Sequence, residues 1–320
     1  MAQAKGSSAQ LGIQKEVTYK TDPSPDMTRI HIVSCDLGLD GSLEESKTIQ
    51  SNRNAVEPFR GRKNVPGSIV VELQAYIAKL FEGLLGSNTT TGVSPYTHTI
   101  KVGTSIPSFV MEKGFSDIAQ YFKLNGVKIG KMSMSITDSG PQPITFSLVG
   151  AKETVSGTSF DATQTDLGKT MFDGLAIGTI EEGGSASAII TSIDGLTIDN
   201  GLDEGIYVLG SSGERVSLPE GTVKVTGTVK ALFDSITLYN KAVNNTESSI
   251  KVKYAKGDGL GSVGNESIEF LIPELKYAPK SPPISGPNGV YVELPFTGFY
   301  GNSTEASIFQ IVLKNAQATI

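Results

Sequence analysis

The most obvious candidates for catalytic residues are two pairs of adjacent acids: Glu44 with Glu45, and Asp203 with Glu204. Glycoside hydrolases usually use two catalytic carboxylates, one on each side of the glycosidic bond that is cleaved. Both pairs, however, end the same nine-residue pattern, LGLDGSLEE at 37–45 and LTIDNGLDE at 196–204. An active site rarely needs acids in the same place in each half of a chain. We therefore interpret the pairs as solvated loop ends or as contacts to a neighbouring subunit.

Two glycine-containing motifs could hold phosphates. The stretch GLGSVG at 259–264 fits GxGxxG, but NESIEFLIP follows it and has the pattern of a strand. A pyrophosphate site needs a helix N-terminus at that point, so we predict a hairpin loop instead. Gly168-Lys169-Thr170 ends like a phosphate-binding loop, yet Thr163 stands where that loop requires its first glycine. We predict no nucleotide site.

The sequence has few residues that could serve in nucleophilic catalysis or bind a metal. The chain has two histidines, His31 and His98, one cysteine, Cys35, and no GxSxG elbow. His98 lies in PYTHTI, and we predict that it faces solvent. No Cys/His cluster has zinc-ligand spacing, and no Asp/Asn series fits a twelve-residue calcium loop. We therefore predict a protein that is not an enzyme and that has no cofactor and no metal.

The densest basic segment is FRGRKN at 59–64, with Arg60, Arg62 and Lys63, and Arg53 precedes it. These side chains could contact nucleic acid, or they could pair with acids of a neighbouring subunit. The chain has 27 Lys and Arg against 33 Asp and Glu, a net charge of −6. Strong binding to nucleic acid depends on an excess of basic residues, so the charge favours the second interpretation.

Length and composition limit the possible folds and cellular compartments. A chain of 320 residues predicts about two domains. One cysteine allows no internal disulfide, which fits a reducing compartment. The start MAQAKGSSAQ has no apolar core of a secretory signal, and no run of 18 apolar residues predicts a membrane helix. With 36 glycines, no tryptophan and short apolar runs that alternate with Ser, Thr and Lys, the composition is typical of a mostly β protein.

The elements that would position these residues follow from periodicity. The run SIVVELQAY at 68–76 alternates as a half-buried strand does. In YIAKLFEGLLG at 76–86, apolar residues recur at helical spacing and Gly86 is a natural stop. Three strand-like runs follow at 106–115, 121–136 and 144–153. Residues 1–27 look like an arm, 46–66 like a long loop, and 154–184 like a connector.

The pattern then restarts, with six matched elements in the same order. GTVKVTGTV at 221–229 repeats GSIVVELQA at 67–75, a helical stripe at 238–243 follows, and SGP recurs at 139–141 and 285–287. The predicted fold is mainly β: tandem duplicated β-sandwich or barrel modules, each with one short α-helix and a long loop. The predicted division is an arm at 1–27, module A at 28–153, a linker at 154–184 and module B at 185–320.

The order of these elements resembles the tail tube proteins of tailed bacteriophages. The resemblance rests on the opening LGIQKEVTYKTDPSP, the LxLDxxLEE pattern, the loop before GSIVVEL, the helix YIAKLFEGLLG, and GTVKVTGTVKALFDSITLYNKAVN in the second copy. It covers nearly the whole chain. It implies a virion protein, assembled in the host cytoplasm, whose rings stack into the tube that conducts DNA, and which has no membrane partner.

The resemblance also implies partners and contact residues. A duplicated subunit would form trimeric rings with pseudo-sixfold symmetry, and the tube would meet a tape measure protein and tail-tip or terminator proteins. DNA would pass through the lumen without specific binding. The loop 46–66 and its counterpart 205–220 would then contact neighbouring subunits or rings. The contact residues that we expect are Glu44, Glu45, Arg53, Arg60, Arg62, Lys63, Asp203, Glu204, Glu214 and Arg215.

A second class of function stays open from the residues alone. Tandem β-domains also build virion decoration proteins and cell-surface adhesins, although an adhesin usually has an export signal and an anchor. Self-assembly discriminates between the two classes, because only a tube protein is expected to polymerise end to end.

Overall fold

The computed structural model describes residues 3–203, 205–284 and 286–320. Over these ranges the chain is mainly β, with two short α-helices and large antiparallel sheets, which confirms the predicted fold class. The first repeat comprises 3-10 helix η1 (Gly6–Ser8), β1 (Ala9–Lys15), β2 (Thr28–Ile30), β3 (Ser34–Cys35), β4 (Asp40–Glu44), β5 (Phe59–Glu72), α1 (Ala78–Leu85), β6 (Gly86–Thr91), β7 (Tyr96–Val102), β8 (Phe109–Phe115), β9 (Gln120–Ile136), β10 (Pro143–Gly150) and β11 (Lys152–Ser156). The second repeat, after 3-10 helix η2 (Gly174–Ala176), comprises β12 (Ile177–Glu182), β13 (Ser185–Ala186), β14 (Ile190–Asp199), β15 (Lys224–Leu232), α2 (Thr237–Val243), β16 (Ser248–Ala255), β17 (Ser267–Tyr277), β18 (Tyr291–Gly298) and β19 (Gln310–Asn315).

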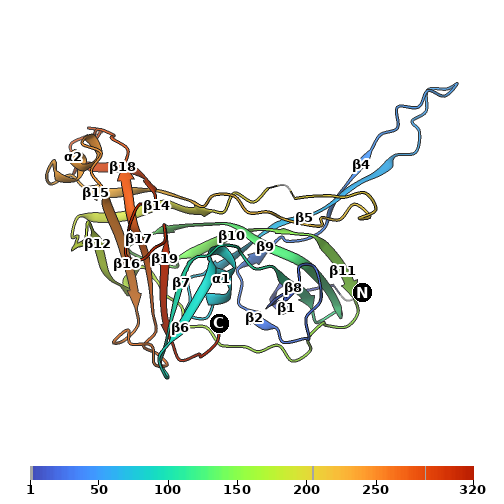
Figure 1. Ribbon diagram of the computed structural model, residues 1–320, viewed down its shortest axis with the longest axis horizontal. Helices are drawn as coiled ribbons and strands as arrows, with labels where there is room; N and C mark the ends of the chain where they lie inside the picture. The colour runs from blue at the N-terminus through green and yellow to red at the C-terminus, as the bar shows by residue number, and fades with distance from the viewer. Residues whose placement is uncertain (1–2, 204, 285) are drawn as a thin grey trace.

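A central sheet, formed by eight antiparallel strands of the described residues, runs through both repeats. Its order is β3–β5–β10–β9–β14–β15–β18–β17. The first four strands come from the first repeat and the last four from the second. Figure 1 shows the first repeat, in blue to green, around α1, and the second, in yellow to red, at the other end of the molecule.

Two outer sheets complete the layers. In the first repeat the order is β2–β1–β8–β9–β11. In the second it is β13–β12–β16–β17–β19, and the hairpin β6–β7 of the first repeat adds to β19. The long strands β9 and β17 pair in both layers, so each repeat folds over on itself as a sandwich or barrel does.

The pairing scheme occurs twice. The pairs β1–β8, β3–β5, β5–β10, β8–β9, β9–β10 and β9–β11 have counterparts in β12–β16, β14–β15, β15–β18, β16–β17, β17–β18 and β17–β19. The matched order of elements seen in the sequence therefore has a matched order in space.

The residue-level match between β5 and β15 differs from the sequence prediction by six positions, whereas the match of 37–45 with 196–204 is kept. Gly67 pairs with Leu148, and Gly227 pairs with Phe296. VPGSIVV at 65–71 therefore corresponds to VTGTVKA at 225–231, whereas the sequence comparison paired 67–75 with 221–229. An even shift keeps the alternation of buried and exposed residues, so periodicity could not detect it. The shared glycine identifies the correct alignment of the two strands, because this position requires glycine: a Cβ at Gly67 would overlap the backbone of Leu37.

Helix α1 forms as predicted and packs between the repeats. Its apolar stripe is buried, and it ends at Gly86 in the left-handed conformation, with φ 94°. The Phe81 ring centroid lies 5.9 Å from that of Phe146 in β10 and 6.0 Å from that of Phe270 in β17. Phe81 therefore joins the two repeats into one apolar core.

The predicted arm and linker contain strands. Residues 9–15 form β1, which pairs with β8 of the same chain, and Leu11 and Ile13 are buried. This part of the predicted arm is therefore a strand of its own repeat. At the other end, the segment 154–184 holds the end of β11 and all of β12. Since β12 pairs with β16 as β1 pairs with β8, each repeat begins with such a strand.

The predicted loop 46–66 is irregular over residues 46–58, as expected, but residues 59–66 belong to β5 and form a β-hairpin with β4. β4 pairs with the first half of β5, and residues 45–58 connect them. Figure 1 shows this hairpin projecting well beyond the body of the molecule. Most of its residues are exposed on both faces, so no alternation of apolar and polar residues marks the strands.

Candidate assembly interface

The junction between the repeats is an edge-to-edge pairing of β9 with β14. Met132 pairs with Ile198 and Met134 with Leu196, and all four side chains are buried. Ser133 and Thr197 alternate with them and face the other side. The junction therefore continues the central sheet with the same division into an apolar and a polar face.

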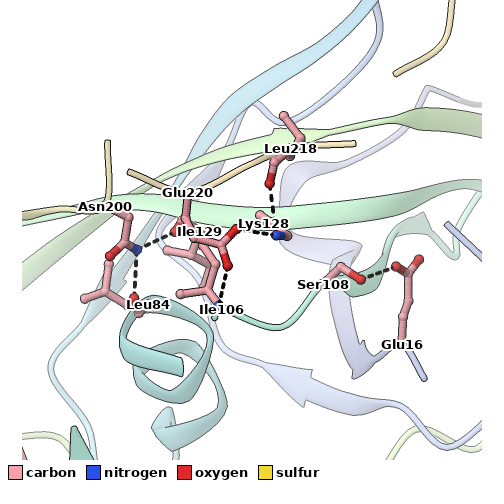
Figure 2. A network of polar contacts seen from close by, with 9 residues as sticks. All are labelled: Glu16, Leu84, Ile106, Ser108, Lys128, Ile129, Asn200, Leu218 and Glu220. Atoms are coloured by element: carbon pink, nitrogen blue, oxygen red, sulfur yellow. Dashed lines mark hydrogen bonds and ion pairs between the residues drawn. The ribbon is translucent and has the colours of Figure 1, made fainter. Parts of the chain in front are cut away.

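Asn200, directly after β14, joins the junction to α1 (Figure 2). Its side chain is 1% exposed, and Nδ2 donates to the Leu84 carbonyl at 2.7 Å and to the Ile129 carbonyl at 3.0 Å. The last carbonyls of a helix lack partners within the helix. The side chain of Asn200 provides a hydrogen-bond donor for the last turn of α1 and, at the same time, for a carbonyl of β9.

Glu220 and Lys128 form the second polar contact of the junction (Figure 2). Lys128 Nζ lies 2.9 Å from a Glu220 carboxylate oxygen and donates to the Leu218 carbonyl at 2.9 Å. The Ile106 N–H donates to Glu220 at 3.2 Å. Burial by itself raises the pKa of Glu220, but the hydrogen bond and the charge of Lys128 outweigh it and hold the pKa below its ordinary value of 4.5.

The segment 205–220 ends against the base of the β4–β5 hairpin. The Lys63 N–H donates to the Gly213 carbonyl at 2.9 Å, and Arg215 donates to the Gly150 carbonyl at 2.9 Å. The Arg62 guanidinium lies 4.7 Å from the centroid of the Tyr207 ring. The structure therefore brings the predicted contact residues Arg62, Lys63 and Arg215 together within one chain.

Glu214, another predicted contact residue, lies in the same place. Its carboxylate oxygens are 2.6 Å from Lys20 Nζ and 3.5 Å from Lys63 Nζ. Burial raises the pKa of Glu214, and the hydrogen bond and charge of Lys20, with the charge of Lys63, lower it to a net value below 4.5. This acid therefore stabilises the contact between the repeats when it is ionised.

The remaining predicted contact residues are dispersed. Glu44, Glu45, Arg53 and Arg60 are exposed along the β4–β5 hairpin. Asp203 lies in the segment after β14, where its N–H donates to the Pro219 carbonyl at 3.2 Å. Glu204 lies outside the described residues. These positions stay predicted contacts to other subunits.

Sequence reasoning missed the residues that make the junction: Asn200, Lys128 and Glu220. One signal was available for Asn200. In the repeated pattern, LTIDN ends with Asn200 where LGLDG ends with Gly41. A difference between two copies at an otherwise matched position marks a contact that only one copy makes. Lys128 and Glu220 look like ordinary surface charges in the sequence.

The histidine prediction was wrong. His98 is fully buried, and Nε2 lies 3.1 Å from Asn315 Oδ1 and 3.0 Å from the Gln317 carbonyl. Two acceptors at one nitrogen require a proton there, so the ring donates through Nε2. His98 thus ties β7 of the first repeat to the end of β19. Because threonines flank His98 in YTHTI, no alternation of apolar and polar residues indicated which face of this strand is buried.

The other motifs have structural roles. GLGSVG lies in the loop between β16 and β17, as predicted. Within the described residues, no three His, Cys, Asp or Glu side chains gather as a metal site would require. The helices of the described ranges include none long and apolar enough to cross a membrane. A cleft of about 580 Å³ opens beside Leu85 and Tyr300, and its acid, Glu220, is already bonded to Lys128.

At each end of the central sheet, part of the edge has no partner strand within the described residues. Among the described residues, no strand pairs with the edge of β3 that faces away from β5, where Val33 is 62% and Leu39 48% exposed. At the other end, residues 278–284 continue from β17 beside β18: the Ala278 N–H donates to the Pro295 carbonyl at 2.7 Å, and Lys280 pairs with Glu293 at 3.0 Å. This segment is the counterpart of the part of β9 that accepts β14.

No curated protein matches the chain. The family described as phage tail tube protein matches residues 6–298, which is nearly the whole chain. Its members are structural proteins of the virion tail. With its mainly β architecture and its edge-to-edge junction, the chain belongs to the phage tail tube protein family.

Proposed function

We propose that this chain closes into rings by pairing the free edge of β3 in one copy with residues 278–284 of the next. The observation that carries this proposal is the β9–β14 junction, which already joins two such units head to tail inside one chain. An interface between unlike surfaces closes into a ring when its rotation allows. Because exposed sheet edges readily accept a strand, the two ends of the central sheet are suited to each other.

The strand count supports a ring of three. Each copy contributes eight strands to the central sheet, so three copies contribute three times eight, or 24. With strands about 4.8 Å apart, an untilted barrel of that size is roughly 36 Å across at the backbone, and tilt widens it. Such a bore admits a DNA duplex. Stacked rings would form the conduit.

The polar face of the central sheet suits a lumen through which DNA slides. It is predominantly hydroxyl-bearing, with Ser133, Thr145, Thr197 and Thr226 at least partly exposed. Its charges are mixed, with Asp36, Glu72, Asp199 and Glu293 alongside Lys131, Lys224, Lys230 and Lys276. Phosphates bind where basic residues are in excess, so a balanced face holds DNA weakly.

The β4–β5 hairpin is the proposed contact to other subunits or rings. It exposes Leu43, Ile49 and Phe59, which are 70%, 97% and 63% accessible, beside the charges of Glu44, Arg53 and Arg60. Exposed apolar side chains grouped on a projecting element mark an interaction surface. The tape measure and tail-tip or terminator proteins are the further partners that we propose for the assembled tube in the virion.

A disulfide experiment tests ring closure. By the correspondence of the repeats, Asp40 and Ala278 should meet between copies as Asp199 meets Lys131 inside the chain. Asp40→Cys and Ala278→Cys would be combined with Cys35→Ser, oxidised and separated on non-reducing gels. We expect covalent chains that end at a closed trimer, whereas each single-cysteine variant stops at dimers.

Electron microscopy separates the alternatives. Hollow rods whose subunits stay uncross-linked would leave the tube role intact and refute these two edges as the ring contact. Compact monomers that stay unassembled when mixed with tail-tip complexes would refute the self-assembling tube and favour a decoration or adhesion module.

A further inference from the structure

The proposed ring has two kinds of joint: the β9–β14 junction inside each chain and the contact between copies. The two joints differ in the segment with which the incoming strand pairs. Inside the chain, β14 pairs with residues 131–136 of β9, which read KMSMSI. The corresponding segment of the second repeat is 278–283, which reads APKSPP. The correspondence follows when the register is continued. Met132 pairs with Phe146, and the pairs Lys276–Thr297 and Tyr277–Phe296, continued by two residues, would place position 279 opposite Leu294, the counterpart of Phe146.

The prolines stand where backbone donors are needed. The Ala278 N–H points at β18, since it donates to the Pro295 carbonyl. Successive N–H groups of a strand point in opposite directions, so a continuation of β17 through 278–283 would direct positions 279, 281 and 283 away from β18 toward the free edge. Two of these three positions are proline, Pro279 and Pro283, and both are exposed. Proline has no N–H, and natural proteins place it on sheet edges that must not pair freely.

A second difference lies on the other partner. At the internal joint, Asn200 donates to the carbonyls of Leu84 and Ile129. The corresponding residue at the start of the β4–β5 hairpin is Gly41, which has no side chain to donate. The joint between copies therefore lacks two backbone donors on one side, at Pro279 and Pro283, and the side-chain donor of Asn200 on the other.

We propose that these missing donors, above all at Pro279 and Pro283, make ring closure the weaker of the two joints. This proposal rests on the proposed function. The partner of the 278–284 segment is the β3 edge of a second copy of this chain. Each backbone hydrogen bond restored at that joint should strengthen it about fivefold, by the usual net value of such a bond.

The test is a double variant, Pro279→Met with Pro283→Ile, which installs the residues that β9 has at 132 and 136. Pro287→Ser, in the exposed loop beyond the segment, is the matched control. The readout is the lowest protein concentration at which rings or rods form, measured by light scattering and sedimentation and checked by electron microscopy. Urea unfolding of each variant establishes that its fold is kept.

We expect the double variant to assemble at a concentration at least tenfold lower than wild type and with a shorter lag, while the control behaves as wild type; two restored bonds at about fivefold each set that scale. An unchanged or higher concentration, in a variant that assembles and unfolds normally, would overturn the role of the prolines and leave the proposed function standing. If no variant assembles at any concentration, even with preformed tail tips, the proposed function fails as well.

Discussion

Replacing Asn200 tests whether the junction holds the repeats together as its geometry indicates. Asn200→Ala removes two hydrogen bonds, to the carbonyls of Leu84 and Ile129, and leaves both carbonyls buried. At about 1 kcal/mol for each bond, the free energy of unfolding should fall by about 2 kcal/mol. Oδ1 of Asn200 finds no hydrogen-bond partner among the described residues, so its removal costs nothing further.

Asn200→Asp is the sharper variant, because it keeps the shape and replaces the donor with an acceptor. An ionised carboxylate facing two carbonyl oxygens in a buried site should destabilise the chain by a further ~1–3 kcal/mol. Burial favours the neutral acid, so the pKa of the introduced carboxyl should be raised in the folded chain. The stability of this variant should therefore fall as the pH rises above the ordinary pKa of an aspartic acid.

The assay is urea unfolding followed by circular dichroism and tyrosine fluorescence, which the absence of tryptophan leaves unobscured. Asn288→Ala, on an exposed loop, is the control and should unfold as wild type does. An alanine variant within about 0.5 kcal/mol of wild type would contradict the assigned role of Asn200, since that is less than one ordinary hydrogen bond. An aspartate variant as stable as the alanine variant at neutral pH would contradict it independently.

Three further predictions concern pH, packing and charge. Because the folded-state pKa of Glu220 lies below 4.5, its contact with Lys128 should stabilise the chain fully above that pH and lose its effect as the pH falls through the folded value; unfolding of Glu220→Gln against wild type, from neutral to acidic pH, measures this. Gly67→Ala should lower stability by about 1–3 kcal/mol, because the backbone around Leu37 must move, whereas Gly41→Ala meets no atom and should be nearly neutral in thermal unfolding. Thr226→Lys should make assembled tubes retain DNA at low salt and release it as salt rises, and cosedimentation without any gain in DNA would contradict our placement of the lumen.

The periodicity of apolar residues was sufficient to predict which segments form strands or helices and in what order they follow. Buried strands such as β10 alternate strictly, and α1 has a helical stripe that ends at a glycine, so both could be predicted. Repetition of LGLDGSLEE as LTIDNGLDE revealed two similar units. Periodicity failed for the β4–β5 hairpin because solvent lies on both of its faces, and for His98 because a polar residue occupies an inward position of β7.

The residues alone establish a duplicated, mainly β chain with no evident catalytic constellation, but how the two copies meet depends on the folded chain. Which edge pairs with which, that β1 belongs to its own chain, and that Asn200 bridges α1 and β9 all depend on residues far apart in sequence. Apart from proline, every residue has the same backbone donor and acceptor, so these groups do not specify which edges pair. Edge pairing is selected by register, burial and the prolines that remove a donor, and these act only once the sheet exists.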